Sequence, residues 1–297
     1  MTREVEDLFA RQLLVWPQFA KGVEGLAKAT TRPLRLDWFD IVVRHIEHRK
    51  ASTTASVDSE SIAKRPCFLC AANLPREEEG LQFDKNFTIY CNPFPIVDRH
   101  LTIAHKEHGS QRIANQFGSM LDLALALDGY FVVYNGPECG ASAPDHMHFQ
   151  AGSRVLFPIE KDTAGLTGVT VPDYERNVFL FRGRDRSALI DRMDRAIGLL
   201  AEITGKHPEP MVNIAVFHER GEWVSYLFPR AKHRPEVFHT GELTVSPASI
   251  DLCGIFVVPR APDFERIAGD AISAILREVT LPDDQFQEVA RKLGSEC

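Results

Sequence analysis

Residues 131–152 read FVVYNGPECGASAPDHMHFQAG, and the rest of the chain is arranged around this stretch. The pattern predicts an apolar strand, a loop rich in Gly, Pro and Ser, and a second short strand. Because alternate side chains of a strand share a face, His146, His148 and Gln150 are predicted to point one way. The apolar residues between them then point into a core. Polar groups that are buried need partners, so three on one face indicate a site rather than packing.

Composition excludes several classes of protein. The chain has 297 residues, 44% of them hydrophobic and 25% charged, which is typical of a globular protein with one large or two small domains. The formal net charge of −7 argues against a general nucleic-acid binder. No secretory signal or membrane-length apolar run is present, so we expect a cytoplasmic protein whose six cysteines are thiols or metal ligands.

The N-terminal part is predicted to be a helical and extended lead-in. Apolar spacing over 5–29 indicates a helix that Pro17 breaks or kinks, and 33–43 looks extended. The basic, Ser/Thr-rich stretch 44–64 favours a solvated loop, with a substrate-covering flap as the alternative.

The first half of the core is predicted as strands at 87–91 and 101–105 around a proline-rich turn at 92–96, followed by a helix over 111–127. The second half repeats this kind of pattern, with helices predicted at 185–204, 263–278 and 284–293 and strands at 211–217, 223–228 and 254–259.

These two half-length units lack an obvious linker and indicate one duplicated α+β domain, with an antiparallel sheet and helices packed on it. We expect residues 1–64 to form the lead-in on the core, 65–160 the first half with the active site, and 161–297 the second half.

Two cysteines separated by two residues, Cys67 and Cys70, have the spacing of half a zinc site, because both thiolates can reach one tetrahedral ion. A thioredoxin-like redox pair needs a helix to follow, and residues 73–75 do not begin one convincingly. Two plain buried thiols remain the alternative.

His148 has the chemistry of a phosphorus nucleophile, since an imidazole can attack phosphorus and form a phosphoramidate. Gln150 on the same face can donate a carboxamide N–H to a phosphate oxygen, but it cannot give up a proton at neutral pH. The preceding loop could turn its N–H groups into an anion-binding nest, formed by Asn135, Gly136, Gly140, Ala141 and Ser142.

The order His-x-His-x-Gln after a Gly-rich loop resembles the transferase branch of the histidine-triad (HIT-like) superfamily. That branch contains galactose-1-phosphate uridylyltransferase, diadenosine tetraphosphate phosphorylase and GDP-hexose (GDP-L-galactose type) phosphorylase. Residues 134–142 look like the loop of the dinucleotide phosphorylases, and 146–151 look like the GDP-hexose phosphorylases. Residues 92–96 resemble the segment that lines their nucleoside pocket.

The resemblance implies a duplicated HIT-like fold in which His148 becomes nucleotidylated and Gln150 binds the phosphate. His146 is the third catalytic candidate, because we expect a backbone carbonyl near it to hold the other nitrogen of His148 and fix its tautomer. The resemblance also implies nucleoside contacts from Asn92, Pro93 and Phe94. In the uridylyltransferases two histidines complete a Cys₂His₂ zinc site, and the matching positions here are His108 and His146. This zinc is expected to be structural.

A cationic patch follows the second hairpin and contains Lys232 and Arg234. Two interpretations of this patch remain, a solvated turn and a contact to phosphate.

We therefore expect a nucleotidyltransferase or phosphorylase that cleaves a nucleoside diphosphate sugar or a dinucleoside polyphosphate through a nucleotidyl-His148 intermediate. Phosphate or a sugar phosphate would accept the nucleotidyl group. The alternatives are a HIT-type hydrolase and a non-catalytic nucleotide-binding protein. Neither nucleic acid nor a membrane is an expected partner, and the oligomeric state stays open between a monomer and a homodimer.

Overall fold

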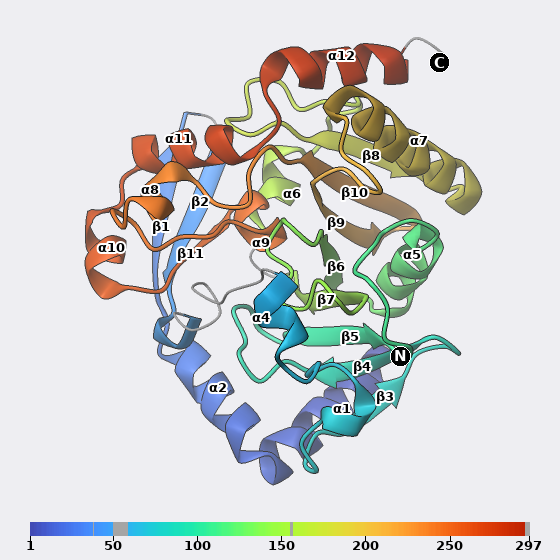
Figure 1. Ribbon diagram of the computed structural model, residues 1–297, viewed down its shortest axis with the longest axis vertical. Helices are drawn as coiled ribbons and strands as arrows, with labels where there is room; N and C mark the ends of the chain where they lie inside the picture. The colour runs from blue at the N-terminus through green and yellow to red at the C-terminus, as the bar shows by residue number, and fades with distance from the viewer. Residues whose placement is uncertain (38, 50–58, 155–156, 295–297) are drawn as a thin grey trace.

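A computed structural model describes residues 1–37, 39–49, 59–154 and 157–294, and it contains one large antiparallel sheet (Figure 1). The strands in spatial order are β3 (Gly80–Gln82), β4 (Phe87–Cys91), β5 (Leu101–His105), β7 (His148–Ser153), β6 (Tyr130–Asn135), β9 (Val212–Glu219), β10 (Glu222–Pro229) and β8 (Phe179–Gly183). The first five belong to the first half of the chain and the last three to the second. The two halves meet where β6 pairs with β9, from Val132 opposite Val216 to Asn135 opposite Asn213. The expected α+β class with an antiparallel sheet is confirmed.

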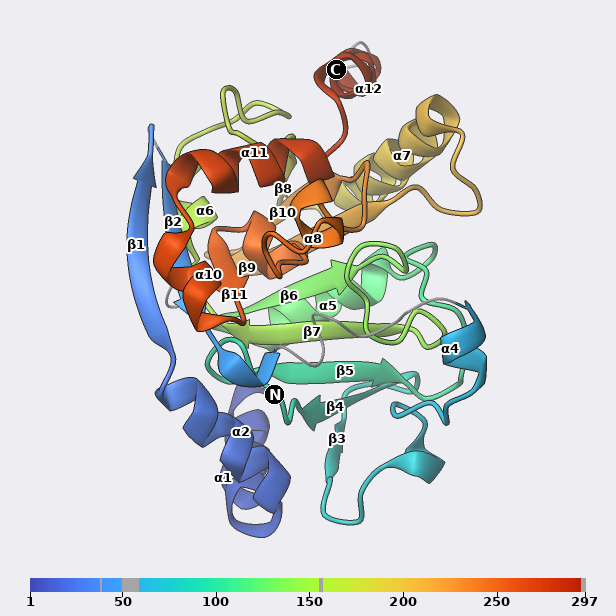
Figure 2. The same ribbon diagram turned by 60° about the vertical axis from the view of Figure 1, so that its left-hand side comes forward.

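A second, three-stranded sheet ties the N-terminal lead-in to the C-terminal part. The hairpin β1 (Thr30–Leu36) and β2 (Phe39–His45) pairs in parallel with β11 (Ile255–Val258), so segments far apart in the sequence lie side by side (Figure 2). The stretch predicted as a solvated loop begins within β2 and continues as a short 3₁₀ turn, η1 (Glu47–Arg49). Its middle, residues 50–58, lies outside the described residues.

Each predicted helical segment contains helix, with two corrections given below, and four short helices of the described residues were not predicted. The helices are α1 (Thr2–Val15), α2 (Pro17–Ala27), α4 (Ser59–Ala63), α5 (Phe117–Ala126), α6 (Pro158–Asp162), α7 (Arg186–Thr204), α8 (Glu236–His239), α9 (Ser249–Leu252), α10 (Ala261–Arg266), α11 (Gly269–Val279) and α12 (Asp283–Gly294), with a 3₁₀ turn η2 (Ala71–Asn73). Pro17 is the first residue of α2, where its missing N–H costs nothing.

The helix predicted over 111–127 begins only at Phe117. Gln111 is instead buried with its side chain bonded to two strands, and the Ile113 N–H donates to Glu209 at 2.6 Å. The helix predicted over 263–278 is two helices, because Ile267 and Ala268 are extended. In both places a tertiary or local backbone feature overrides the apolar periodicity.

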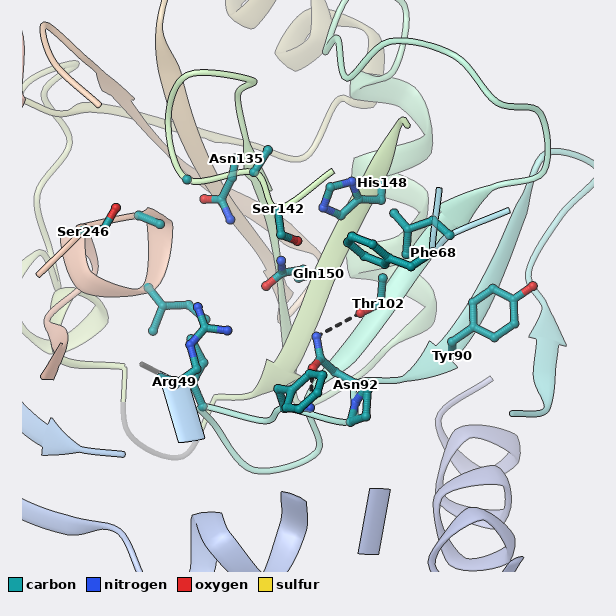
Figure 3. A pocket seen from close by; sticks show the side chains of 18 of the residues that line it. Arg49, Phe68, Tyr90, Asn92, Thr102, Asn135, Ser142, His148, Gln150 and Ser246 are labelled. Carbon is teal, nitrogen blue, oxygen red and sulfur yellow. Dashed lines mark hydrogen bonds between the residues drawn. The ribbon is translucent and has the colours of Figure 1, made fainter. Parts of the chain in front are cut away.

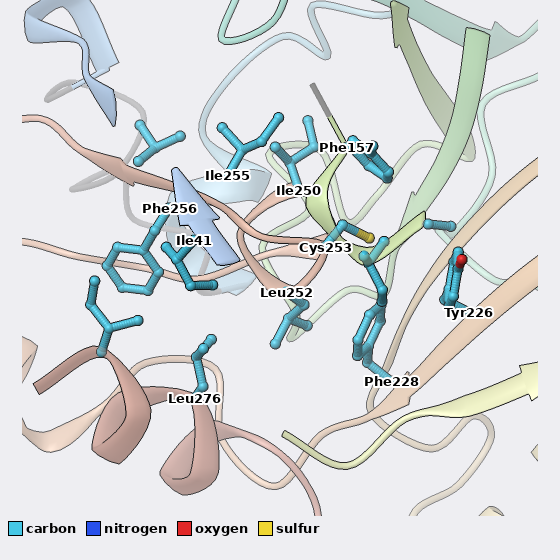
Figure 4. Packing of buried hydrophobic residues seen from close by; sticks show 14 of the residues in the cluster. Ile41, Phe157, Tyr226, Phe228, Ile250, Leu252, Cys253, Ile255, Phe256 and Leu276 are labelled. Carbon is cyan, nitrogen blue, oxygen red and sulfur yellow. The ribbon is translucent and has the colours of Figure 1, made fainter. Parts of the chain in front are cut away.

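The large sheet has a hydrophobic core on each face. Alternation along β9 sends Ile214 into the core beneath α5 and α7, and Ala215 into the core beneath the small sheet. Figure 4 shows how the second core joins distant elements, with Ile41 from β2, Phe228 from β10 and Leu276 from α11. No helix in the described part of the chain is long and apolar enough to cross a membrane.

Candidate active site

A cavity of about 570 Å³ opens on the face of the large sheet that carries Gln150. Both halves of the chain line it (Figure 3). The predicted site residues that the structure brings together there are Asn92, Pro93, Phe94, Asn135, Gly140, Ala141, Ser142, His148, Gln150 and Arg234.

The structure places three other predicted site residues outside the cavity lining. The Gly136 N–H donates to the Val212 carbonyl at 3.0 Å, so it is part of the packing between the halves. The Lys232 ammonium forms an ion pair with Glu278 at 2.7 Å. The His146 ring turns toward the cysteine pair, because it precedes β7 in a bend and the strand alternation does not yet apply there.

His148 is the first residue of β7, and its ring is buried with a fixed tautomer. Its Nδ1–H donates to the His146 carbonyl at 2.8 Å, which leaves the lone pair on Nε2. Burial lowers the pKa of His148 to about 4, so the ring is neutral at neutral pH. The sequence predicted a carbonyl partner near His146, and the structure has it.

The backbone beside His148 is held by Gln111, a residue that the sequence reasoning did not select. Its Oε1 accepts from the His148 N–H at 2.8 Å, and its Nε2 donates to the carbonyls of His148 and Asn135, each at 2.9 Å. One buried side chain therefore fixes the start of β7 against the end of β6.

The carboxamide of Gln150 is oriented by His100, which the sequence reasoning also missed. The Ile96 N–H donates to His100 Nδ1 at 3.3 Å, so the ring proton is on Nε2 and donates to Gln150 Oε1 at 3.0 Å. Burial lowers the pKa of His100 to about 3, which keeps this neutral form. The amide NH₂ of Gln150 then faces the cavity beneath Ser142 (Figure 3).

Asn135 connects the cavity to the second half of the chain. Its Oδ1 accepts from Asn213 Nδ2 at 2.7 Å and from the Ser249 hydroxyl at 2.7 Å. Its amide nitrogen points toward the cavity in Figure 3. In the loop that follows, Gly140 has φ +94°, and an added Cβ would lie 2.8 Å from that of Ala248, so only glycine fits there.

Two guanidinium groups line the cavity wall contributed by η1 and the second half. Arg49 belongs to the stretch that the sequence predicted as solvated, and Arg234 donates from Nε to the Ser246 hydroxyl at 3.4 Å. Burial lowers the pKa of both groups, which remain cations. Figure 3 shows Arg49 across the cavity from His148.

A carboxyl group, Glu78, lines the cavity together with Phe68 and Tyr90. Burial raises its pKa from 4.5 to about 7. Nothing in its sequence context, a run of three glutamates, distinguishes it from its neighbours.

Replacing Glu78 by Gln is expected to raise the melting temperature by about 2 to 4 °C at pH 8. The folded-state pKa lies above the unfolded value, so the ionised carboxyl opposes folding above pH 7. This gain should shrink as the pH falls from 7 toward 4.5 and be largely lost at pH 5. Differential scanning fluorimetry measures it, with the exposed Glu77→Gln as a control that should show no change. A gain that grows toward pH 5 would contradict the assignment.

The predicted zinc ligands Cys67, Cys70, His108 and His146 lie together, with their donor atoms within 4.8 Å of one another. Bonds of about 2.3 Å to sulfur and about 2.0 Å to nitrogen place unlike ligands of one tetrahedral zinc ion roughly 3.5 Å apart. The sulfur-to-nitrogen distances here are 3.3, 3.3 and 3.6 Å.

The surroundings also fit a metal. His146 Nε2–H donates to the His105 carbonyl at 2.6 Å, which leaves Nδ1 facing the thiols. A carbonyl in this position is a common outer partner of a metal-bound histidine. The donor set therefore fits a closed, structural Cys₂His₂ zinc site. The other histidines in this region have different partners: His100 bonds to Ile96 and Gln150, and His105 Nδ1 accepts from the Glu107 N–H at 3.1 Å.

Sequence profiles of two families match the chain almost end to end. Residues 8–153 match a domain of unknown function, DUF4922, and residues 156–296 match the family described as GDPGP1-like, C-terminal domain. Among curated proteins none matches the sequence.

Crystal structures of yeast Ap4A phosphorylase Apa2 share the fold. One superposes with a TM-score of 0.60 at 19% identity over 95% of this chain and 94% of that chain. The complex with AMP gives 0.61 at 17% identity over 94% and 96%, and the complex with Ap4A gives 0.57 at 16% over 90% and 97%. The likeness covers both halves and both sequence profiles.

Proposed function

We propose that this chain is a phosphorylase-type nucleotidyltransferase. Its C-terminal half matches the family described as GDPGP1-like, C-terminal domain, and its fold is shared with yeast Ap4A phosphorylase. Its substrate would be a nucleoside diphosphate hexose or a dinucleoside polyphosphate. The observation that carries the proposal is His148, a buried neutral imidazole whose Nδ1–H is held at 2.8 Å by a carbonyl and whose Nε2 is left for the cavity.

In the first step, His148 Nε2 attacks the α-phosphorus of the substrate. A P–N bond forms, the bond from phosphorus to the bridging oxygen breaks, and a sugar phosphate or nucleotide leaves with the electron pair of that bond. The Nδ1 proton stays on the imidazole, where the His146 carbonyl stabilises the positive charge that develops.

Amide donors around the α-phosphorus stabilise its oxygens. The NH₂ of Gln150, oriented by His100, and the amide nitrogen of Asn135 both face the cavity beside His148. Phosphoryl transfer depends mostly on positioning and on such charge stabilisation.

In the second step, an oxygen of orthophosphate attacks the same phosphorus, the P–N bond breaks and a nucleoside diphosphate is released. The cations Arg49 and Arg234 line the wall from which this anion would approach. Gln150 cannot act as a proton donor or acceptor for water, which favours an intermediate that waits for the phosphate.

The Cys₂His₂ set would hold a structural zinc ion that fixes the bend immediately before the catalytic strand β7. Its ligand His146 also supplies the carbonyl that holds the His148 tautomer. The ion takes no part in either chemical step.

Intact-protein mass spectrometry tests the mechanism. The protein is incubated without phosphate with GDP-glucose or Ap4A, and we expect one added nucleoside monophosphate group, released as the nucleoside diphosphate when phosphate is added. The His148→Ala variant should form no adduct. The partly exposed His218, outside the cavity lining, gives the matched control, since His218→Ala should keep the adduct. Phosphate-independent cleavage without an adduct would indicate a hydrolase, and neither adduct nor cleavage would indicate a binding protein.

A further inference from the structure

The loop between η2 and β3 carries three successive glutamates, of which one turns into the cavity. Glu77 and Glu79 are exposed, and Glu79 forms an ion pair with Arg11 at 3.3 Å. Glu78 is the one that lines the cavity. The local backbone therefore directs the middle carboxylate into the cavity, whereas the two flanking glutamates stay in solvent.

A fully buried glutamine in α1, Gln12, holds this backbone on both sides of Glu78. Its Nε2 donates to the Glu77 carbonyl at 2.9 Å, and its Oε1 accepts from the Glu79 N–H at 3.1 Å. The Glu78 N–H itself donates to the Pro75 carbonyl at 3.1 Å. This arrangement fixes the peptide units around Glu78, as expected for a group that must be placed accurately.

The Glu78 carboxylate has two acceptor oxygens and receives no hydrogen bond or ion pair from the described residues. Burial is what raises its pKa to about 7. An acid that is partly desolvated without a partner opposes folding, so its position indicates that a ligand supplies the donors.

Glu78 belongs to the aromatic end of the cavity rather than to its cationic end. Burial raises the pKa of Tyr90, and the charge of Glu78 raises it further, as expected for two groups that line the same part of the cavity. Figure 3 shows Phe68 and Tyr90 on one side of His148 and Gln150, and Arg49 and Ser246 on the other. Flat aromatic walls suit a nucleobase, and the guanidinium end suits phosphates.

We propose that Glu78 selects guanine as the base of the substrate. The Watson–Crick edge of guanine presents N1–H and N2–H₂ side by side, and the two oxygens of an ionised carboxylate accept from both. Adenine presents a lone pair at N1, which faces a carboxylate oxygen without a proton between them. This inference rests on the proposed function, and it makes a guanosine diphosphate hexose or a diguanosine polyphosphate the substrate class.

The Glu78→Gln variant tests the proposal, because the change inverts the hydrogen-bonding pattern at constant shape. Toward adenine, the glutamine carbonyl accepts from N6–H₂ while its NH₂ donates to N1. Toward guanine, the same NH₂ faces N1–H or N2–H₂, which are donors as well. Values of kcat/KM are measured for phosphorolysis of GDP-glucose and ADP-glucose at pH 8.5, above the pKa of about 7, where the wild-type carboxyl is ionised.

The wild-type protein is expected to prefer GDP-glucose by about 100-fold or more, since a site built around donors rejects a base that lacks them. Glu78→Gln should lower this ratio to about one or below, with a gain for ADP-glucose as well as a loss for GDP-glucose. The exposed Glu77→Gln should keep the wild-type ratio. A wild-type preference for ADP-glucose, or a ratio that Glu78→Gln changes less than threefold, would overturn the proposal.

Titration calorimetry with GMP and AMP separates this inference from the proposed function. Tighter binding of GMP that Glu78→Gln abolishes would support guanine selection even if no substrate turned over, and the proposed function alone would then fail. Turnover of both sugar nucleotides with equal binding of GMP and AMP would support the function and refute guanine selection.

Discussion

Replacing His148 by alanine is expected to lower the rate of nucleotidyl transfer by about 10⁴-fold or more, the loss typical of removing a covalent nucleophile. Two other imidazoles of this region, those of His100 and His146, do not replace it because they are committed elsewhere. His100 donates from Nε2 to Gln150 and accepts at Nδ1 from Ile96, while His146 faces the thiols of Cys67 and Cys70.

Nucleotide affinity should change little in this variant, within about threefold, because the proposed base and phosphate contacts come from other side chains. Folding should also survive the substitution. The backbone of residue 148 is held by Gln111 through both its N–H and its carbonyl, and those bonds do not involve the imidazole. A neutral ring is removed, so no buried charge is left unpaired.

Rapid-quench kinetics and calorimetry on the same preparations measure the two effects. His148→Ala should lose the phosphate-dependent burst and the covalent adduct together while still binding the nucleoside monophosphate. The His218→Ala control should keep all three. Retention of an adduct in His148→Ala would show that another residue is the nucleophile and would refute the proposed mechanism.

Local patterns made part of this structure predictable from sequence. The alternation after His148 places Gln150 in the cavity and Phe149 in the core because a strand imposes a period of two. The limits of β4 and β5 agree with the predicted strands because prolines and a turn bound them closely. The Cys-x-x-Cys spacing is likewise a local geometric requirement.

Other features depend on contacts that no local pattern encodes. Gln111 looks like the first residue of an amphipathic helix, yet two carbonyls and an N–H of distant strands draw it into the core. Arg49, in a stretch of solvated composition, lines the cavity, whereas Lys232 in the obvious cationic patch pairs with Glu278. Glu78 is held apart from its neighbours with the help of Gln12, which is 66 residues away in the chain and bonds to the backbone on both sides of it.

Removal of metal is expected to have the largest effect on stability. The four donor groups come from three separate segments: the hairpin of Cys67 and Cys70, the loop after β5 with His108, and the bend before β7 with His146. An ion that joins them closes loops of about 40 and 80 residues, and structural zinc contributes about 10 to 16 kcal/mol in zinc-finger peptides. We expect one zinc per chain and a fall in melting temperature of more than about 10 °C after chelation.

Metal analysis combined with thermal unfolding tests this expectation. Cys70→Ser should lose the metal and about as much stability as chelation, and added chelator should then have no further effect. Cys91→Ala provides the matched control, because Cys91 is a buried thiol outside the cluster. It should unfold at a moderately lower temperature with its metal content unchanged. A chain purified without metal, with a melting temperature that neither chelator nor zinc alters, would leave the cysteines as plain buried thiols.

The metal should also affect catalysis through its ligand His146, because the carbonyl of that residue holds the Nδ1–H of His148 at 2.8 Å. Chelation at a temperature where the chain stays folded should therefore lower kcat more than it changes KM, since the tautomer of the nucleophile is loosened while the base and phosphate contacts remain. Readdition of zinc should restore kcat. An equal loss in kcat and in nucleotide affinity would instead indicate that the zinc site supports the whole cavity and has no specific link to His148.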